Sequence, residues 1–465
     1  MPALGWVGIV RLGLVQTALG AIVVLTTSTI NRVMVVELGL AAAIPGLLVG
    51  MHYAIQLLRP RWGHGSDVGG RRTPWILGGM AVLTTGGFLA AVATAVMETS
   101  LAAGLVLAVV AFLMIGVGVG AAGTSLLVLL AKRVAPERRA AAATIVWVMM
   151  IFGFIVTAAT AGHYLDPFTT GRLVLVSGVV SLIAMLVAMI AVAGVEGSVG
   201  AAGVGANGGA RTAVAQAATS MRDTAEAQHK TPFMAALREV WREDEARRFT
   251  IFVFVSMLAY SAQDLILEPY AGAVFAFTPG QSTQLAGTQH GGVLAGMIGV
   301  AAIATLAKGT ILASLRLWTV VGCLASAAAL ASLAAAGQIG PDWPLSSSVF
   351  LLGLANGAFA VAAIGSMMAR AGRGASSREG VRMGLWGAAQ AIAFGAGGLT
   401  GAVLVDLAGL VTASDADAYG LVFCGEALLF LAAALIALRI APVEAVGGGA
   451  ARPRVDAVAE NMLAR

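Results

Sequence analysis

The chain has 465 residues, of which 59% are hydrophobic and only 11% charged; its mean hydropathy is +0.90 and its net charge +5. Soluble globular chains carry about 25% charged residues, so this composition excludes that class and indicates a polytopic membrane protein. The many glycines and alanines also suit membrane helices, because small residues let helix backbones approach closely.

Apolar runs of membrane-spanning length recur along the whole chain. A transmembrane helix needs about 20 residues, and each run meets or approaches that length. The runs form two sets of six and predict an all-α polytopic membrane protein with twelve transmembrane helices in two six-helix bundles. The predicted spans are 11–36, 42–59, 75–97, 101–131, 142–163, 172–194, 249–271, 284–307, 313–336, 345–369, 383–408 and 419–440.

The two sets of spans divide the chain into four regions. We expect an N-terminal bundle at 1–194, a central cytoplasmic loop at 195–248, a C-terminal bundle at 249–441 and a cytoplasmic tail at 442–465. Within the loop, residues 232–247 place apolar side chains on one face of a helix. This pattern predicts either an amphipathic helix lying on the membrane or a solvated linker helix.

A polar loop between the second and third spans carries a spaced motif made of Gly63, Asp67, Gly70, Arg71 and Arg72. This motif resembles the loop between helices 2 and 3 of major facilitator superfamily transporters. The resemblance implies the fold of that superfamily, in which the Asp and Arg latch the two halves together near the cytoplasmic end of helix 11. We expect these residues to stabilise one conformational state and not to contact cargo.

Positive charge is distributed so that it orients the chain. If residue 1 is cytoplasmic, all of the 28 Lys and Arg residues except Arg32 and Arg172 fall in cytoplasmic segments. Because cytoplasmic loops are enriched in Lys and Arg, both termini are predicted to be cytoplasmic. The spread of charge over every inner loop explains the basic composition without a nucleic-acid partner.

Polar residues inside membrane spans are the candidate functional residues, because burying them in lipid is costly. His52 lies near mid-membrane, with Gln56 one turn further along the same helix face. Asn356 lies at a similar depth in its span, and Glu426 lies in the outer half of the last span. Near the outer boundary we place a further group, Asp264, Glu268, Arg32, Glu37, His163 and Asp406.

Five segments of the first eighty residues narrow the resemblance within the superfamily. Residues 11–16, 31–38, 59–61, 65–67 and 71–75 together resemble the bacteriochlorophyll delivery family, which includes PucC-like and LhaA-like proteins. Within that family they look nearest to the subgroup labelled bacteriochlorophyll synthase 44.5 kDa chain. The rest of the chain matches mainly in the layout of its spans.

The resemblance implies a non-catalytic assembly factor in the inner, intracytoplasmic photosynthetic membrane of a phototrophic bacterium. Such a factor binds or delivers bacteriochlorophyll, as cargo or ligand, to light-harvesting or reaction-centre subunits. Bacteriochlorophyll biosynthetic enzymes are further expected partners, together with membrane lipids, and no soluble cofactor is expected.

Bacteriochlorophyll carries a central Mg²⁺ that accepts an axial ligand, so the polar residues acquire possible roles. His52 is the preferred ligand, with Gln56, Asn356 or Glu426 as hydrogen-bond partners or substitute ligands. For each of these, a purely structural hydrogen bond between helices is the alternative. Arg32 with Glu37 forms either a boundary ion pair or part of a pigment exit.

Two other functions stay open. In a proton-coupled transporter of a small molecule, the proton site would be Asp264, Glu268 or Glu426. A bacteriochlorophyll synthase would need paired Asp-rich motifs that hold Mg²⁺ and diphosphate, and the acidic pairs of this sequence are isolated. We therefore expect no catalysis.

Overall fold

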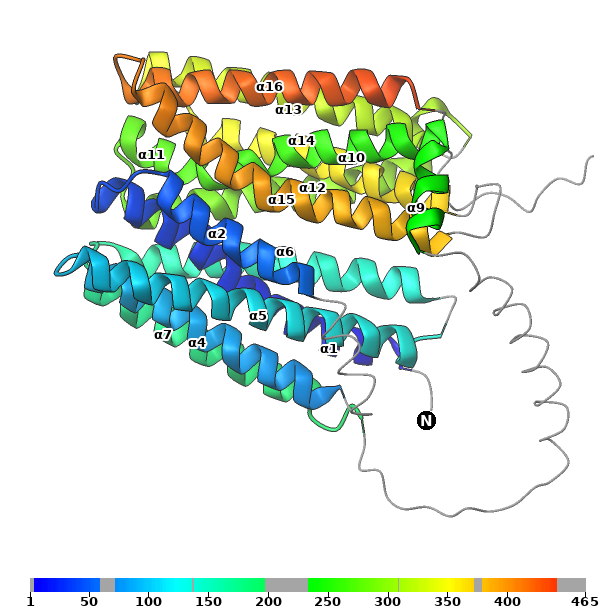
Figure 1. Ribbon diagram of the computed structural model, residues 1–465, viewed down its shortest axis with the longest axis horizontal. Helices are drawn as coiled ribbons and strands as arrows, with labels where there is room; N and C mark the ends of the chain where they lie inside the picture. Colours follow the sequence, from blue (N-terminus) through cyan, green and yellow to red (C-terminus); the bar gives the residue numbers. More distant parts are fainter. Residues whose placement is uncertain are drawn as a thin grey trace, which may run out of the picture.

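The computed structural model describes residues 4–58, 72–135, 138–196, 233–307, 309–371 and 379–440. Within these ranges the chain is helical without any β-strand, and its long helices run side by side along one axis (Figure 1). Ten of the described helices are long and apolar enough to cross a membrane, or up to eleven if one bent pair counts as a span. The shorter apolar helix Ala43–Ile55 completes the predicted set, so the all-α membrane fold is confirmed.

The first half of the bundle contains six spans, and the first of them is partly π-helical. The elements are α1 (Trp6–Val24), η1 (Leu25–Ile30), η2 (Val33–Glu37), α2 (Ala43–Ile55), η3 (Gln56–Leu58), α4 (Thr73–Met97), α5 (Leu101–Arg133), α6 (Arg139–Leu165) and α7 (Thr170–Val192).

A short helix, α9 (Phe233–Arg242), precedes the second half. The elements of that half are α10 (Asp244–Ala262), η5 (Gln263–Leu265), α11 (Leu267–Phe275), α12 (Pro279–Leu306), η6 (Ile311–Ala313), α13 (Leu315–Ile339), α14 (Leu345–Ala371), α15 (Glu379–Gly409) and α16 (Asp415–Leu438).

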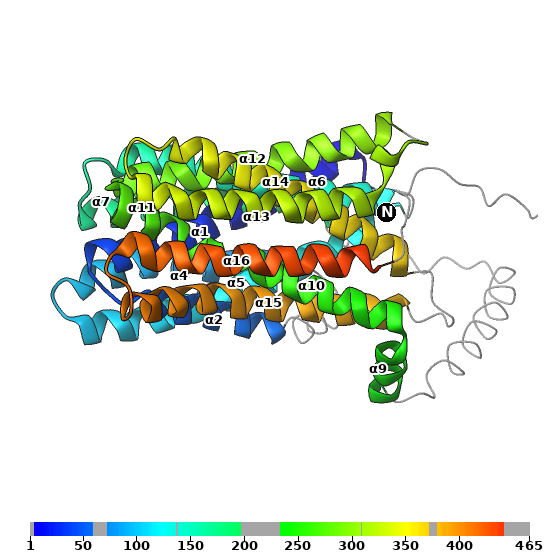
Figure 2. The same cartoon turned by 90° about the horizontal axis from the view of Figure 1, so that it is seen from above.

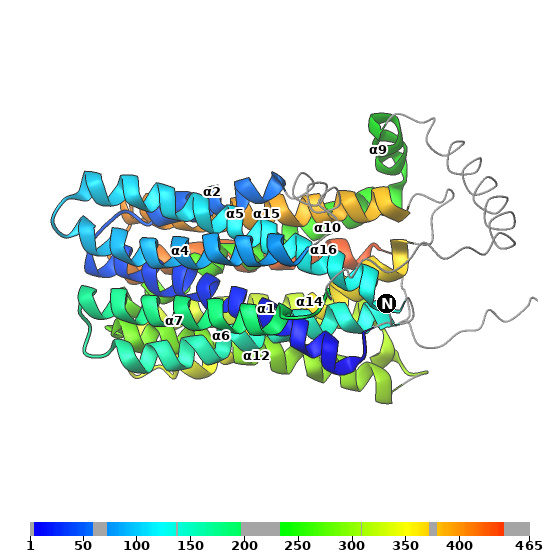
Figure 3. The same cartoon turned by 90° about the horizontal axis from the view of Figure 1, so that it is seen from below.

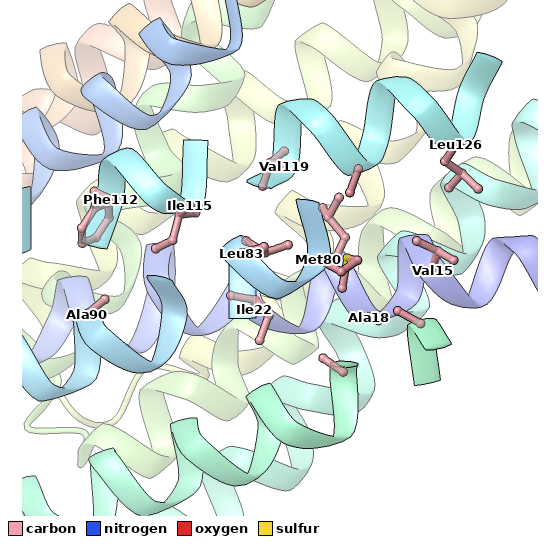
Figure 4. Close-up of a cluster of buried hydrophobic side chains, with 14 of the residues drawn as sticks. Val15, Ala18, Ile22, Met80, Leu83, Ala90, Phe112, Ile115, Val119 and Leu126 are labelled. Atoms are coloured by element: carbon pink, nitrogen blue, oxygen red, sulfur yellow. The ribbon is translucent and has the colours of Figure 1, made fainter. Parts of the chain in front are cut away.

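The two halves lie against each other along two helix pairs. In Figure 1 the first half, blue to teal, lies below the second half, green to red. Helix α6 packs against α12, and α2 packs against α15, so both pairs cross the interface between the halves. Each half also has its own hydrophobic core. Figure 4 shows the first, where Ile22 of α1 lies near Leu83 of α4 and Ile115 of α5.

Glycines allow the helices of each half to approach closely. A Cβ atom at Gly296 of α12 would overlap the backbone carbonyl oxygen of Leu354 on α14, and one at Gly153 of α6 would overlap that of Thr17 on α1. Close packing of this kind provides the attraction between membrane helices, where lipid weakens the hydrophobic contribution.

Several helices begin earlier than the apolar pattern predicted. Helix α12 begins at Pro279, where the side chain of Thr278 caps the backbone N–H of Gln281, and α16 begins after the capping residue Ser414. Helices start at polar capping residues, which an apolar run does not include. The predicted starts at 284 and 419 were therefore several residues late.

The predicted amphipathic helix 232–247 is not one helix. It is interrupted at Glu243, whose backbone is extended (ψ 113°), so that α9 ends at Arg242 and α10 begins at Asp244. Residues 244–247 belong to the seventh span, which starts before the predicted residue 249. Figures 2 and 3 show α9 lying across the bundle axis, where α10 begins. Of the predicted loop 195–248, residues 197–232 lie outside the described ranges, as does the tail 442–465.

Candidate functional site

Polar contacts tie the two halves together toward one end of the bundle. We call the end that carries the turns 38–42, 276–278 and 410–414 the far end, and the end that carries α9 the termini end (Figure 1). The side-chain amide of Asn31 donates a 2.7 Å hydrogen bond to the carbonyl oxygen of Leu265. Nearby, the hydroxyl oxygens of Thr29 and Thr283 lie 2.9 Å apart. Both contacts join the first span to the second half.

Arg32 forms the ion pair with Glu37 that was one of its two predicted roles. Its guanidinium also donates a 2.6 Å hydrogen bond to the carbonyl oxygen of Phe277, across the interface. The side chain is only 3% exposed, so protein encloses it. It lies beside a surface groove of about 690 Å³ that Glu37, Asp166 and Thr278 also line. Arg32 therefore links both halves beside a surface groove at the far end.

Two further carboxylates cross the interface at the far end. Asp406 of α15 accepts hydrogen bonds from the backbone N–H groups of Ala42 and Ala43, at 2.8 and 2.7 Å, and so caps the start of α2. Asp166 accepts one from the hydroxyl of Thr278 at 2.7 Å. The position of Asp406 was predicted, but its role was not, and Asp166 was not singled out. Together these contacts hold the far end closed.

The seventh span bends by 42° between Leu265 and Leu267. Pro269 explains the bend, because it has no N–H to donate to the carbonyl four residues earlier, and its ring clashes with that carbonyl. That carbonyl belongs to Leu265, and Asn31 is the donor that satisfies it. The sequence contains the signal for this bend, an isolated proline inside an apolar run.

Three acidic side chains gather around the bend. Glu268 is 3% exposed, beside Ser28 of the first span, and Asp264 lies one turn earlier. Glu426 of α16 is also 3% exposed and close enough to Asp264 for their charges to repel. The predicted depth of Asp264 and Glu268 near the outer boundary stays a prediction, and the structure adds that Glu268 is enclosed by protein beside the first span.

The residues predicted to bind pigment lie in three separate surroundings. His52 is 3% exposed, and its Nε2 atom lies 2.9 Å from Nε2 of Gln56. Asn356 is fully buried and accepts a 2.8 Å hydrogen bond from the hydroxyl of Ser326, between α14 and α13. Glu426 belongs to the acidic group described above. Of the four, the structure brings His52 and Gln56 into contact.

A histidine that the sequence analysis passed over lies between the halves. His290 of α12 packs edge-on against Phe154 of α6, with ring centroids 4.7 Å apart. Its Nδ1 atom lies 2.8 Å from the carbonyl oxygen of Ala286. The residue is about 16 Å from the start of α12, at 1.5 Å per residue. Counted from this observed helix start, the depth argument that selected His52 would also have found His290.

Of the spaced loop motif, Gly63, Asp67, Gly70 and Arg71 lie outside the described residues, so the predicted latch stays a prediction. Arg72 is described, and the carboxylate of Glu196 accepts hydrogen bonds from the backbone N–H groups of Arg72 and Thr73, all at 2.8 to 2.9 Å. Burial of Glu196 opposes its ionisation, but these hydrogen bonds prevail and hold its pKa below the ordinary value. Glu196 therefore caps α4, a role that the sequence analysis missed.

Ion pairs also anchor the start of α10 at the termini end. Arg382 of α15 pairs with Glu243 at 2.7 Å, and Arg370 of α14 pairs with Glu245. Both arginines are nearly buried, at 3% and 5% exposure of their side chains. The charged start of the seventh span is thus bound to its own half. Among the described residues, no group of three or more His, Cys, Asp or Glu is arranged to hold a metal ion.

Comparison with known protein families shows to which family the chain belongs. The family model described as PUCC protein matches residues 29–445, which is most of the chain. The chain belongs to the PUCC protein family.

Two relatives illustrate the range of sequence identity. The chain is 50% identical over 456 residues to the "Bacteriochlorophyll synthase 44.5 kDa chain" of Rhodobacter capsulatus, covering 98% of this chain and 99% of that one. It is 28% identical over 453 residues to "Protein PucC" of the same species, covering 92% and 91%. The predicted family and subgroup resemblance is confirmed.

Solved structures confirm the transporter-like fold of this PUCC family member. A crystal structure of the peptide transporter POT in complex with sulfate superposes with a TM-score of 0.63 at 15% identity, over 95% of this chain and 97% of that one. A bacterial homologue of the human lysosomal transporter Spinster, in an inward-facing and unoccupied conformation, gives 0.64 at 14% identity, over 93% and 96%. At these identities the likeness concerns the fold alone. The protein is thus a multi-pass membrane protein with the major facilitator fold.

Proposed function

We propose that this PUCC family member binds bacteriochlorophyll within the membrane and delivers it during assembly of light-harvesting or reaction-centre complexes. The observation that carries the proposal is the 50% identity, over nearly the whole chain, to a protein named for bacteriochlorophyll synthesis. A fold shared with solute carriers supports delivery, because such a fold encloses cargo between two halves.

The chemistry of the interior supports an apolar cargo. Polar side chains at the interface toward the far end are already engaged in contacts between the halves, as Asn31 is with Leu265 and Asp406 with Ala42. Few charged groups inside the spans then remain to coordinate a polar solute. A bacteriochlorin ring with a long hydrocarbon tail requires mainly apolar contact and one axial ligand for its Mg²⁺.

We further propose that the chain resides in the inner, intracytoplasmic photosynthetic membrane with both termini cytoplasmic. The support is the Lys and Arg distribution, in which only Arg32 and Arg172 fall in outer segments. The closed far end then faces away from the cytoplasm, and cargo enters from the cytoplasmic side. Light-harvesting or reaction-centre subunits are the proposed receivers, with pigment-synthesising enzymes as proposed donors.

We propose no catalytic step for this chain, although its relative is named a synthase. The sequence lacks the paired Asp-rich motifs that hold a diphosphate with Mg²⁺. Incubating the purified protein with bacteriochlorophyllide and a prenyl diphosphate tests this point. Formation of the esterified pigment by the pure chain would contradict the proposal.

Purification from a phototrophic host in mild detergent tests the main proposal. We expect bacteriochlorophyll to elute with the protein, to be identified by its absorption spectrum, and to pass to added light-harvesting polypeptides. A protein that stays colourless, and gains no pigment when bacteriochlorophyll is added, would contradict it. An unrelated major facilitator protein prepared in the same way controls for pigment that adheres to detergent micelles.

One observation favours a second function, a proton-coupled transporter of a small molecule. Asp264, Glu268 and Glu426 lie together at the bend of the seventh span, where protonation would remove their mutual repulsion. Proteoliposomes with an imposed pH gradient distinguish the two functions. Uptake of a dissolved metabolite that is abolished in Glu268→Gln would establish transport, whereas pigment binding that survives this substitution supports delivery.

A further inference from the structure

The two ring nitrogens of His290 differ, because Nδ1 forms a hydrogen bond and Nε2 can act as a metal ligand. Its Nδ1 atom is 2.8 Å from the carbonyl oxygen of Ala286, and a carbonyl oxygen only accepts hydrogen bonds. Nδ1 must therefore carry the proton, which leaves the lone pair of the neutral imidazole on Nε2. No hydrogen bond to Nε2 is formed by any residue in the described part of the chain. Histidines that ligate metals have this arrangement, with the second nitrogen donating to a backbone carbonyl.

The position of His290 along α12 places it at the interface between the halves. Thr283, seven residues earlier and hence on the same helix face, contacts Thr29 of the first span. The ring of Phe154, which packs against His290, also lies close to Gly20 of α1. His290 thus lies about 10 Å closer to the termini end than the Thr29–Thr283 contact, at 1.5 Å per residue. His290 therefore belongs to the interface between α12 and the first half.

The surface of α12 next to His290 is open on one side. The residue is half-buried, and a Cβ atom added to the adjacent Gly291 would meet no atom within 4 Å. By contrast, Gly292, on another face of α12, lies against the backbone of Phe350 on α14. The helix surface beside His290 is therefore partly accessible, as a ligand that reaches the imidazole requires.

We propose that His290 is the axial ligand, through Nε2, of the central Mg²⁺ of a bound bacteriochlorin. The inference rests on the proposed function and deepens it by assigning the binding site. The neutral imidazole replaces a water or detergent oxygen on the metal, so no proton moves and no covalent bond of the pigment changes. Phe154 then orients the imidazole through its edge-on contact.

This assignment differs from the one that the sequence analysis preferred. Nε2 of His52 lies 2.9 Å from the side-chain amide nitrogen of Gln56, and the residue is 3% exposed. Ligation by that nitrogen would require breaking the contact with Gln56 and opening the packing around α2. Nε2 of His290 has no such hydrogen-bond partner in the described part of the chain.

Titration of the full-length protein in nanodiscs with bacteriochlorophyll a tests the assignment. The Qx absorption band and the resonance Raman marker bands of this pigment depend on the ligand of its Mg²⁺. We expect the wild-type protein to give the signature of a single imidazole ligand, and His290→Ala to lose it. Added free imidazole should restore it in His290→Ala, because the substitution leaves room for the missing ring. The matched control is His163→Ala, which removes an exposed histidine from the far end of α6.

The outcomes distinguish the assignment of His290 as the ligand from the proposed delivery of bacteriochlorophyll. Pigment that binds to His290→Ala with an unchanged imidazole signature would overturn the assignment and leave delivery standing, and the same holds if His52→Ala alone abolishes the signature. A wild-type protein that binds no bacteriochlorophyll a would overturn the proposed function itself. Rescue by imidazole also shows that His290→Ala has folded.

Discussion

The side-chain amide of Asn31 donates a 2.7 Å hydrogen bond to the carbonyl oxygen of Leu265, a carbonyl that Pro269 has left without its helical partner. The donor is 1% exposed and lies between the two π-helical segments of the first span. Such segments widen a helix locally and frequently occur at functional sites. The bend of the seventh span and the irregular first span therefore stabilise each other.

Replacing this donor should loosen the far end. Asn31→Leu leaves the Leu265 carbonyl buried without a donor, which costs about 1–3 kcal/mol. If that cost falls on the closed state alone, opening increases by about 5- to 150-fold. Met34 is fully buried, so a cysteine placed there by Met34→Cys reports on opening, and Cys424→Ala removes the exposed native cysteine. We expect maleimide to label this cysteine faster in Asn31→Leu than in the parent protein.

The control for this experiment is Thr160→Val, which removes an exposed hydroxyl that bonds only within α6. Its labelling rate should equal that of the parent protein. An unchanged rate in Asn31→Leu would mean that this contact does not hold the far end closed.

The ion pair of Arg32 and Glu37 should stabilise the folded protein. Arg32 is 3% exposed and Glu37 is 36% exposed, so Glu37→Gln leaves a buried positive charge without its anion. Removing one partner of a fully buried pair costs about 3–5 kcal/mol, and the partial exposure of Glu37 reduces this to about 1–2 kcal/mol. We expect a lower melting temperature in detergent for Glu37→Gln.

The combined variant Arg32→Met with Glu37→Gln should recover part of that loss, because no unpaired charge remains buried. The melting temperatures of the two single variants, the double variant and the parent complete the thermodynamic cycle. Additive losses in the double variant would contradict a direct coupling between the two side chains.

Glu196 predicts a pH-dependent contribution to stability at the termini end. Its folded-state pKa lies below the ordinary value of 4.5, so the contribution is complete above about pH 4.5 and is lost as the pH falls through the folded-state pKa. Glu196→Gln should lower the free energy of unfolding at pH 7 by about 1 kcal/mol, as for other lost helix caps. The measurement is the melting temperature of both proteins between pH 7 and pH 3. A difference that persists undiminished at pH 3 would contradict the capping role.

The sequence predicted the spans well, because apolar length is a local property of the chain. It predicted helix starts less well, as at Pro279 and Asp415, because capping residues are polar. It also placed Arg32 beside Glu37, since the two are five residues apart. A local sequence pattern does not predict contacts between distant spans. The hydrogen bond from Asn31 to Leu265 is an example, because the two residues are 234 positions apart.

The candidate site was predicted only in part for the same reason. Depth along a span singled out His52, yet depth says nothing about which face a histidine presents or what occupies its nitrogens. The structure supplies both, since His52 lies against Gln56, whereas His290 donates to Ala286 and is followed by Gly291, where the helix surface is open. His290 was also obscured by the late predicted start of its helix, which placed it only six residues into the span at 284–307.

A pair of glycines on α12 tests the packing of the second half. Gly296→Ala would place its Cβ onto the backbone of Leu354, so α12 and α14 must separate, and overpacking typically costs about 1–3 kcal/mol. Gly299→Ala, less than one turn away, meets no atom within 4 Å and should be neutral or stabilising by up to about 1 kcal/mol, because alanine favours helix. Melting temperatures in detergent, followed by tryptophan fluorescence, compare the two. Equal effects at both positions would mean that helix propensity, and not the close approach of α14, determines the response.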